Sequence, residues 1–74
     1  MLPTNEIDTL TMTVTAAVDL AAEGQIADGY ACLTYGLHRA EEMAEEGYEW
    51  GQELADRWRR ACDNYAQRYG VKIE

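Results

Sequence analysis

Three glycines at equal intervals are the feature that most limits what this chain can fold into. Gly24, Gly47 and Gly70 each follow a run of residues typical of a helix and are followed at once, or one residue later, by an apolar residue. Helices commonly end where a glycine adopts the left-handed conformation and an apolar residue just beyond it folds back on the last turn. The spacing therefore predicts three helices of roughly 18–22 residues, each about 30 Å long at 1.5 Å per residue.

The order and length of these segments predict an all-α fold, in which three helices run up, down and up in an antiparallel arrangement. If the second and third helices fold back on each other at Gly47, residues equidistant from that glycine come level. Gly36 then lies opposite Trp58, and Gly29 lies opposite Tyr65. A missing side chain facing a large ring is how close-packed layers interlock, so we expect these pairs at the interface.

The first segment allows two interpretations. Threonines alternate with apolar residues over residues 9–15, which is typical of a strand, and residues 71–73 are the other strand candidate for it to pair with. The competing pattern is a helical stripe formed by Ile7, Leu10, Val14, Ala17, Val18 and Ala21. Pro3, with Thr4 or Asn5 as a cap, is a good helix start, so we expect a helix here.

A second alternative concerns the turn at Gly47. Apolar residues recur every three or four positions along the second segment, and this spacing continues past Gly47 and Gly51 into the third. A single helix over residues 25–69 would continue the same apolar stripe and would have to dimerise to cover it. Each glycine inside such a helix costs about 1 kcal/mol relative to alanine, so we favour the hairpin.

Length and charge limit the classes of function. Seventy-four residues make one helical domain, residues 1–74, and 47% of them are hydrophobic. The net charge is −8, which makes the chain a poor ligand for nucleic acids and for anionic membranes. The charge is uneven, because residues 1–28 contain no lysine or arginine, whereas residues 57–74 are mainly basic. We expect the third helix to attract the first two electrostatically.

The two cysteines, the lack of a long apolar run and the lack of a basic-then-apolar leader predict a cytoplasmic protein. Cys32 and Cys62 lack the spacing of a metal site, and a reducing compartment would keep them as thiols. Both are equidistant from Gly47, so the hairpin brings them level. We expect two reduced, buried thiols that act as small apolar residues.

Residues 13–40 resemble a helical hairpin of the tetratricopeptide repeat family. The resemblance rests on small and large residues at set points around a turn, namely Ala17, Leu20, Glu23, Gly24, Gly29, Leu33 and Gly36. It implies a tetratricopeptide-like hairpin followed by a third helix. It also implies a module that binds protein or associates with itself, because such repeats are scaffolds and not catalysts.

The sequence indicates neither catalysis nor a cofactor. His38 is the only histidine, and neither cysteine has an evident base and orienting group for nucleophilic chemistry. His38 with Glu42, Glu45 and Glu46 offers nitrogen and oxygen ligands, but helical dimetal sites use buried glutamates from several helices. We interpret His38 as a partner of Glu42 and the acidic run as a solvated face that pairs with Arg57, Arg59 or Arg60. The run consists of Glu41, Glu42, Glu45, Glu46, Glu49 and Glu53. We therefore expect no metal, no cofactor and no enzyme activity.

With catalysis and cofactors set aside, the surface residues are the remaining indication of function, and they predict protein binding. A strip of small and aromatic residues on the second helix continues into an acidic run, and together they give the candidate contact residues Ala27, Ala31, Tyr35, His38, Glu42, Glu45, Glu46 and Glu49. The hypothesis is a small acidic helical interaction module whose partner is another protein or a second copy of itself in a homodimer. The alternative is an acidic inhibitor that mimics nucleic acid and blocks a basic groove on a partner protein.

Overall fold

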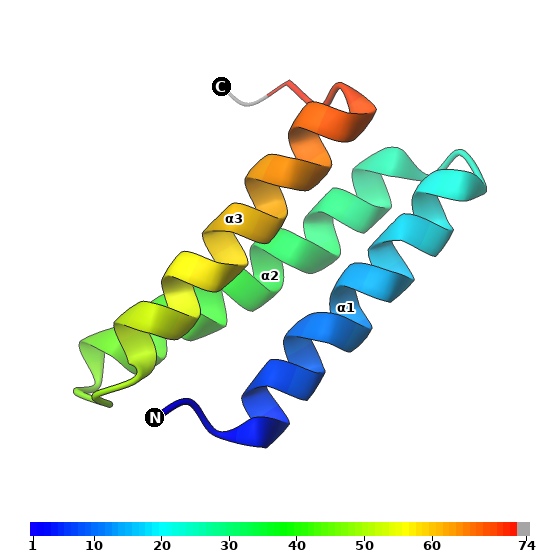
Figure 1. Ribbon diagram of the computed structural model, residues 1–74. Coiled ribbons are helices and arrows are strands. Elements are labelled where there is room, and N and C mark those ends of the chain that lie inside the picture. The colour runs from blue at the N-terminus through cyan, green and yellow to red at the C-terminus, as the bar shows by residue number, and fades with distance from the viewer. Residues whose placement is uncertain (73–74) are drawn as a thin grey trace.

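The chain folds into three antiparallel helices in an up-down-up order, as the sequence predicts. The computed structural model describes residues 1–72, and its elements are α1 (Thr4–Ala22), α2 (Ile26–Glu45) and α3 (Gly51–Tyr69). Figure 1 shows the chain reversing direction at each connection, so that the N-terminus lies at the same end as the α2–α3 turn. Because the chain turns at Gly47, the alternative of one continuous helix over residues 25–69 is wrong.

Each helix ends at the glycine that the sequence singled out. All three glycines have positive φ angles, from 70° to 98°. The backbone N–H of the residue after each glycine donates to a carbonyl five positions earlier, which closes the last turn as a Schellman motif. These bonds join Gln25 to Leu20 at 2.8 Å, Tyr48 to Met43 at 3.3 Å, and Val71 to Ala66 at 2.9 Å.

The start of α1 differs from the expectation in its cap. Pro3, and not Thr4 or Asn5, is the N-cap residue, and no side chain caps this end. The carbonyl of Pro3 accepts hydrogen bonds from the backbone N–H groups of Glu6 at 3.1 Å and Ile7 at 3.3 Å. Pro3 has an extended backbone, and it loses nothing by lacking an N–H at a position where that group has no partner in the helix.

Residues 9–15 lie within α1, so the strand alternative is wrong. The hydroxyl groups of these alternating threonines each donate to the backbone carbonyl four residues earlier in the same helix. The donors are Thr9, Thr11, Thr13 and Thr15, and the distances are 2.7–3.1 Å. These bonds satisfy the hydroxyls locally, while the apolar stripe of α1 packs on α2. Of the tail considered as a pairing partner, Ile73 lies outside the described residues.

The core includes two positions at which α2 has a glycine, so that side chains of α3 come close to its backbone. Gly36 lies under the indole ring of Trp58, because a Cβ at position 36 would come within 2.6 Å of Trp58 Cε3. Gly29 lies between α1 and α3, since its Cβ would lie 2.7 Å from the Ala17 carbonyl oxygen and would meet the Tyr65 hydroxyl. The two predicted glycine–ring pairs are therefore confirmed.

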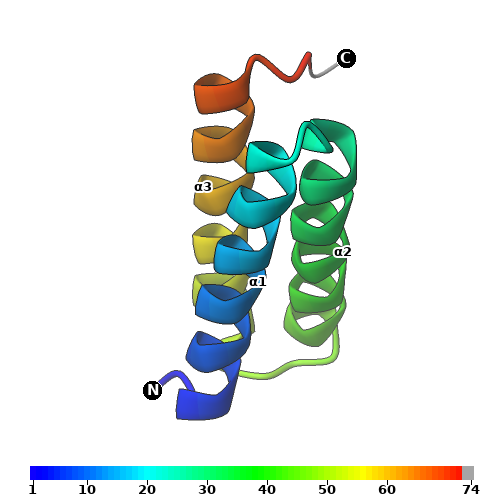
Figure 2. The ribbon, with the colours of Figure 1, turned by 90° about the vertical axis from the view of Figure 1, so that its right-hand side faces the viewer.

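The three helices are not equally close to one another. α2 packs extensively on both α1 and α3, whereas α1 and α3 contact each other sparsely. Figure 2, seen from the side of α1, shows α1 lying along the α2–α3 hairpin. The Cα trace extends 37 × 26 × 14 Å, so the domain is flattened and grooves remain on both sides of α1.

Candidate functional site

The first groove runs between α1 and α2 and has large apolar side chains on both rims. Met12 of α1 and Tyr35 of α2 are 71% and 70% exposed, which makes them the two most exposed large apolar residues within the helices. Gly36 and Trp58 line the same groove, whose volume is about 570 Å³. Exposed aromatic and thioether side chains at the edge of a concave apolar surface are typical of protein contact sites.

The depth of this groove follows from the glycine at position 36. Because Gly36 has no side chain, the ring of Trp58 approaches the backbone of α2 from the core side and lines the groove together with it. The other lining residues are mostly small or polar, including Thr9, Thr13, Ala16 and Ala31. Small residues let another backbone approach closely, so the surface suits a helix better than a bulky ligand.

The eight candidate contact residues are all exposed, and the six that lie within α2 recur every three or four positions, so they share one face of that helix. Ala31 and Tyr35 line the α1–α2 groove, whereas the other six do not. The remaining six, all exposed, are Ala27 and His38 on α2 and four glutamates near its C-terminal end, Glu42, Glu45, Glu46 and Glu49. The acidic run therefore lies beside the groove residues along the chain without lining the groove.

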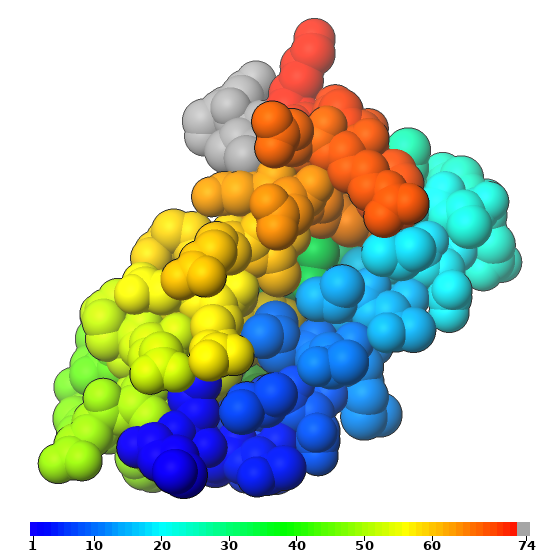
Figure 3. All heavy atoms as spheres, viewed as in Figure 1, coloured from blue at the N-terminus to red at the C-terminus, as the bar shows by residue number. Residues whose placement is uncertain are grey.

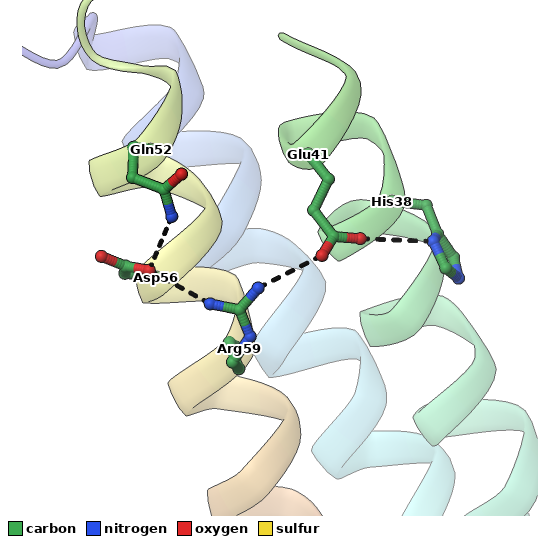
Figure 4. A network of polar contacts seen from close by, with 5 residues as sticks. All are labelled: His38, Glu41, Gln52, Asp56 and Arg59. Carbon is green, nitrogen blue, oxygen red and sulfur yellow. Dashed lines mark hydrogen bonds and ion pairs between the residues drawn. The ribbon is translucent and has the colours of Figure 1, made fainter. Parts of the chain in front are cut away.

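Within residues 1–72, the ion pair that joins the acidic end of α2 to the basic helix α3 is made by Arg59. Its guanidinium contacts Glu41 Oε2 at 3.2 Å and Asp56 Oδ1 at 3.1 Å, and Gln52 donates to the same Asp56 oxygen, as Figure 4 shows. The side chains of Arg59, Glu41 and Asp56 are 42–49% exposed, and the bond from Gln52 is exposed as well. Each of these pairs therefore contributes little to stability. The network marks one side of the α2–α3 hairpin and is not a buried site.

One expectation about ion pairs needs correction, and another is confirmed. His38 Nδ1 lies 3.5 Å from Glu41 Oε1, so its partner is Glu41, three residues on, and not Glu42. The expected pairing of the acidic run with these arginines is confirmed at two places within residues 1–72, since Arg59 pairs with Glu41 at 3.2 Å and Arg57 with Glu53 at 3.3 Å. Arg57 reaches only a glutamate of its own helix, because Arg57 and Arg60 lie on the side of α3 that faces α1.

The expectation of two buried thiols is wrong for one of them. Cys62 is buried, whereas Cys32 is exposed and lines the α1–α2 groove. The buried face of α2 follows Gly29, Leu33 and Gly36, and Cys32 lies about 40° further round the helix from Gly36. Burial raises the pKa of Cys62 to about 11, with the charge of Asp63 adding to the effect. The Cys62 thiol is therefore protonated and unreactive near neutral pH.

Sequence reasoning missed Met12 as a surface residue, although a signal was present. Met12 lies off the stripe that Ile7, Leu10 and Val14 form on the buried side of α1, so its side chain has no place in the core. A large apolar residue off the core stripe of a helix is a candidate for a contact surface. Its neighbour across the groove, Tyr35, was found because it lies beside small residues of α2.

Two further classes of site receive no support from the part of the chain that is described. Within residues 1–72, no group of three or more potential metal-ligating side chains comes together. Over the same range, none of the helices is long and apolar enough to span a membrane.

Comparison of the chain with protein-family models, with curated proteins and with solved structures gives no match.

Proposed function

We propose that this chain is a small, non-catalytic helical module that binds protein, and that it associates with a second copy of itself through the α1–α2 groove. The observation that carries the proposal is the pair of exposed apolar side chains, Met12 and Tyr35, on opposite rims of a groove lined by Gly36 and Trp58. Burying such side chains on contact removes apolar surface from water, and this is the main favourable term in protein association.

A second copy is the partner that this surface fits most simply. Among the described residues, the groove is lined by one cationic residue, Arg39, and otherwise by uncharged side chains, so two copies can approach there despite a net charge of −8 each. In a two-fold dimer the same patch serves both subunits, and Tyr35 of one copy can cover the groove of the other. The resemblance of residues 13–40 to a tetratricopeptide hairpin implies the same class of function.

The proposal that the module is non-catalytic rests on where the possible nucleophiles and the possible base lie. The only histidine, His38, is on the surface beside Glu41, and the Cys62 thiol is buried with a pKa of about 11. Cys32 is accessible, but His38 is not among the residues that line its groove. A nucleophile without an adjacent base is weak, so binding accounts for the surface better than catalysis does.

We further propose that the protein resides in the cytoplasm. Both cysteines are free thiols, and the exposed Cys32 would be open to oxidation outside a reducing compartment.

The acidic inhibitor is the second candidate, and the exposed carboxylates favour it. Glu42, Glu45, Glu46 and Glu49 are all exposed near the α2–α3 turn, and none of them takes part in the ion pairs within residues 1–72. Such a surface could present carboxylates where a basic groove expects phosphates. High salt separates the two candidates, because apolar self-association survives screening whereas charge mimicry weakens steeply.

The test of the proposal is the oligomeric state of a single-residue variant. Sedimentation equilibrium of the parent chain should show a mass that rises with concentration from 8.3 kDa toward twice that value, in both low and high salt. Tyr35→Lys places a charge on the groove rim and should remain a monomer over the same range. The side chain is exposed, so the substitution should leave the helical content by circular dichroism unchanged.

Tyr48→Lys is the matched control, because Tyr48 is an exposed tyrosine in the α2–α3 turn and is not a lining residue of the groove. It should associate like the parent chain. A parent chain that stays monomeric at all concentrations would contradict the proposed self-association. Equal loss of association in both tyrosine variants would show that the contact does not involve the groove.

A further inference from the structure

A second groove, between α1 and α3, combines an apolar floor with a cationic wall. Its volume is about 380 Å³, and among residues 1–72 it shares no lining residue with the α1–α2 groove. Figure 3 shows it as a hollow between α1 and α3 in which atoms of α2 are visible. The hollow exists because α1 and α3 both pack on α2 while making few contacts with each other.

The two walls of this groove differ in chemistry. The α1 wall is apolar and consists of Leu10, Val14 and Val18, which are spaced one helical turn apart. The α3 wall carries Arg57, Arg60, Asn64 and Arg68, which follow one stripe along the exposed side of that helix. Half of the chain's six basic residues therefore line one groove of a protein whose net charge is −8.

These arginines differ in how far they are already engaged. Arg57 is paired with Glu53 at 3.3 Å, and the guanidinium of Arg68 lies 5.3 Å from the centre of the Tyr69 ring. Arg60, between them, forms no ion pair within residues 1–72 and is exposed. Arg60 and Arg68 are thus available to carboxylates that approach along the groove.

We propose that the α1–α3 groove binds an acidic amphipathic helix of a partner protein. The apolar side chains of the bound helix would lie on the floor of the groove, which is formed by Leu33, Ala61 and Tyr65. Its carboxylates would face Arg60 and Arg68 on the α3 wall. An apolar stripe set in a hydrophobic groove, with charges along one flank, is a recurring way for a helix to be recognised.

The shape of the groove favours a helix over an extended peptide. From Arg57 to Arg68 the α3 wall runs for about 16 Å, or three helical turns. Both walls are helices whose backbone groups are paired internally, so they offer no sheet edge to an extended chain. A bound helix satisfies its own backbone and needs only side-chain contacts.

The charge pattern also sets the orientation of the occupant. The cations lie on the α3 wall alone, because the α1 residues that line the groove are uncharged. A basic helix would be repelled by that wall, and a helix with acids on both flanks would place one row against apolar side chains. The occupant is therefore an amphipathic helix with its acids on one flank.

The test uses a designed probe and two single-charge variants. The probe is a fluorescein-labelled synthetic helix of about four turns, with leucines at three- and four-residue spacing and glutamates along one flank. Fluorescence anisotropy at low salt should show saturable binding to the parent chain. Arg60→Glu should weaken this binding roughly ten-fold, whereas Arg59→Glu, with the same charge change at an exposed residue that lines neither groove, should not.

Exchanging the charges of the probe and of the groove tests the proposal from both partners. The same probe with lysine in place of glutamate should not displace the acidic probe from the parent chain, and it should bind the double variant Arg60→Glu/Arg68→Glu more tightly than the parent. Failure of the acidic probe to bind the parent chain, or equal weakening by Arg59→Glu, would overturn the proposal. So would loss of binding in Tyr35→Lys, which lies in the other groove and separates this site from the proposed self-association.

Discussion

Replacing Trp58 with alanine should lower the free energy of unfolding by about 3–5 kcal/mol, which is the largest effect we expect from a single substitution. Trp58 is 2% exposed and lies between the backbone of α2 at Gly36 and the rest of the core. Removing its ring leaves a cavity at the interface that holds the hairpin together. A domain of this size has a small free energy of unfolding, so the variant should already be partly unfolded without denaturant. Urea unfolding followed by circular dichroism measures this loss.

Trp50→Ala is the matched control for this loss. Trp50 is only partly buried and packs against Tyr48 near the α2–α3 turn, with the ring planes tilted by 34° and the ring centres 4.8 Å apart. Its removal should cost about 1 kcal/mol, which is ordinary for a substitution outside the closed core. Equal losses in the two tryptophan variants would mean that Trp58 is not the centre of the packing.

Replacing Gly36 with leucine should destabilise the domain by about 1–3 kcal/mol, although leucine is the better helix former by almost 1 kcal/mol. The first carbon of any side chain at position 36 would already lie 2.6 Å from Trp58 Cε3. Because Trp58 is 2% exposed, its ring would have to leave its place in the core to make room for the new side chain. The melting temperature and the urea midpoint should both fall.

The control for this variant is Ala27→Leu, a substitution of similar size on the exposed side of the same helix. It should change the free energy of unfolding by no more than about 0.5 kcal/mol. If Gly36→Leu melted at or above the parent temperature, the packing of Trp58 over Gly36 would be wrong.

The fold could be predicted from the sequence because its main constraints are local or follow from symmetry about a turn. A glycine and a nearby apolar residue fix each helix end through bonds within six residues. Once Gly47 is a turn, simple counting places Gly36 opposite Trp58 and Gly29 opposite Tyr65. These contacts need no knowledge of how α1 is oriented.

The grooves could not be predicted in the same way. Their existence depends on how far α1 stands from α3, and this spacing is set by the sum of all contacts with α2. The exposure of Cys32 depends on a rotation of about 40° around α2, which is finer than an apolar pattern with three- and four-residue steps resolves. Likewise, the side of α3 that carries Arg57 and Arg60 faces α1, so these residues do not reach the acidic end of α2.

The proposed contact through the α1–α2 groove is tested most directly by the reactivity of the Cys32 thiol as a function of protein concentration. In the dilute native protein, Cys32 should react quickly with a maleimide near neutral pH, whereas Cys62 should react only after denaturation. As the concentration rises and the mass doubles, the rate for Cys32 should fall, because the second copy covers the groove that Cys32 lines. A rate for Cys32 that stays constant while dimers form would contradict the account, since the copies would then meet on another face.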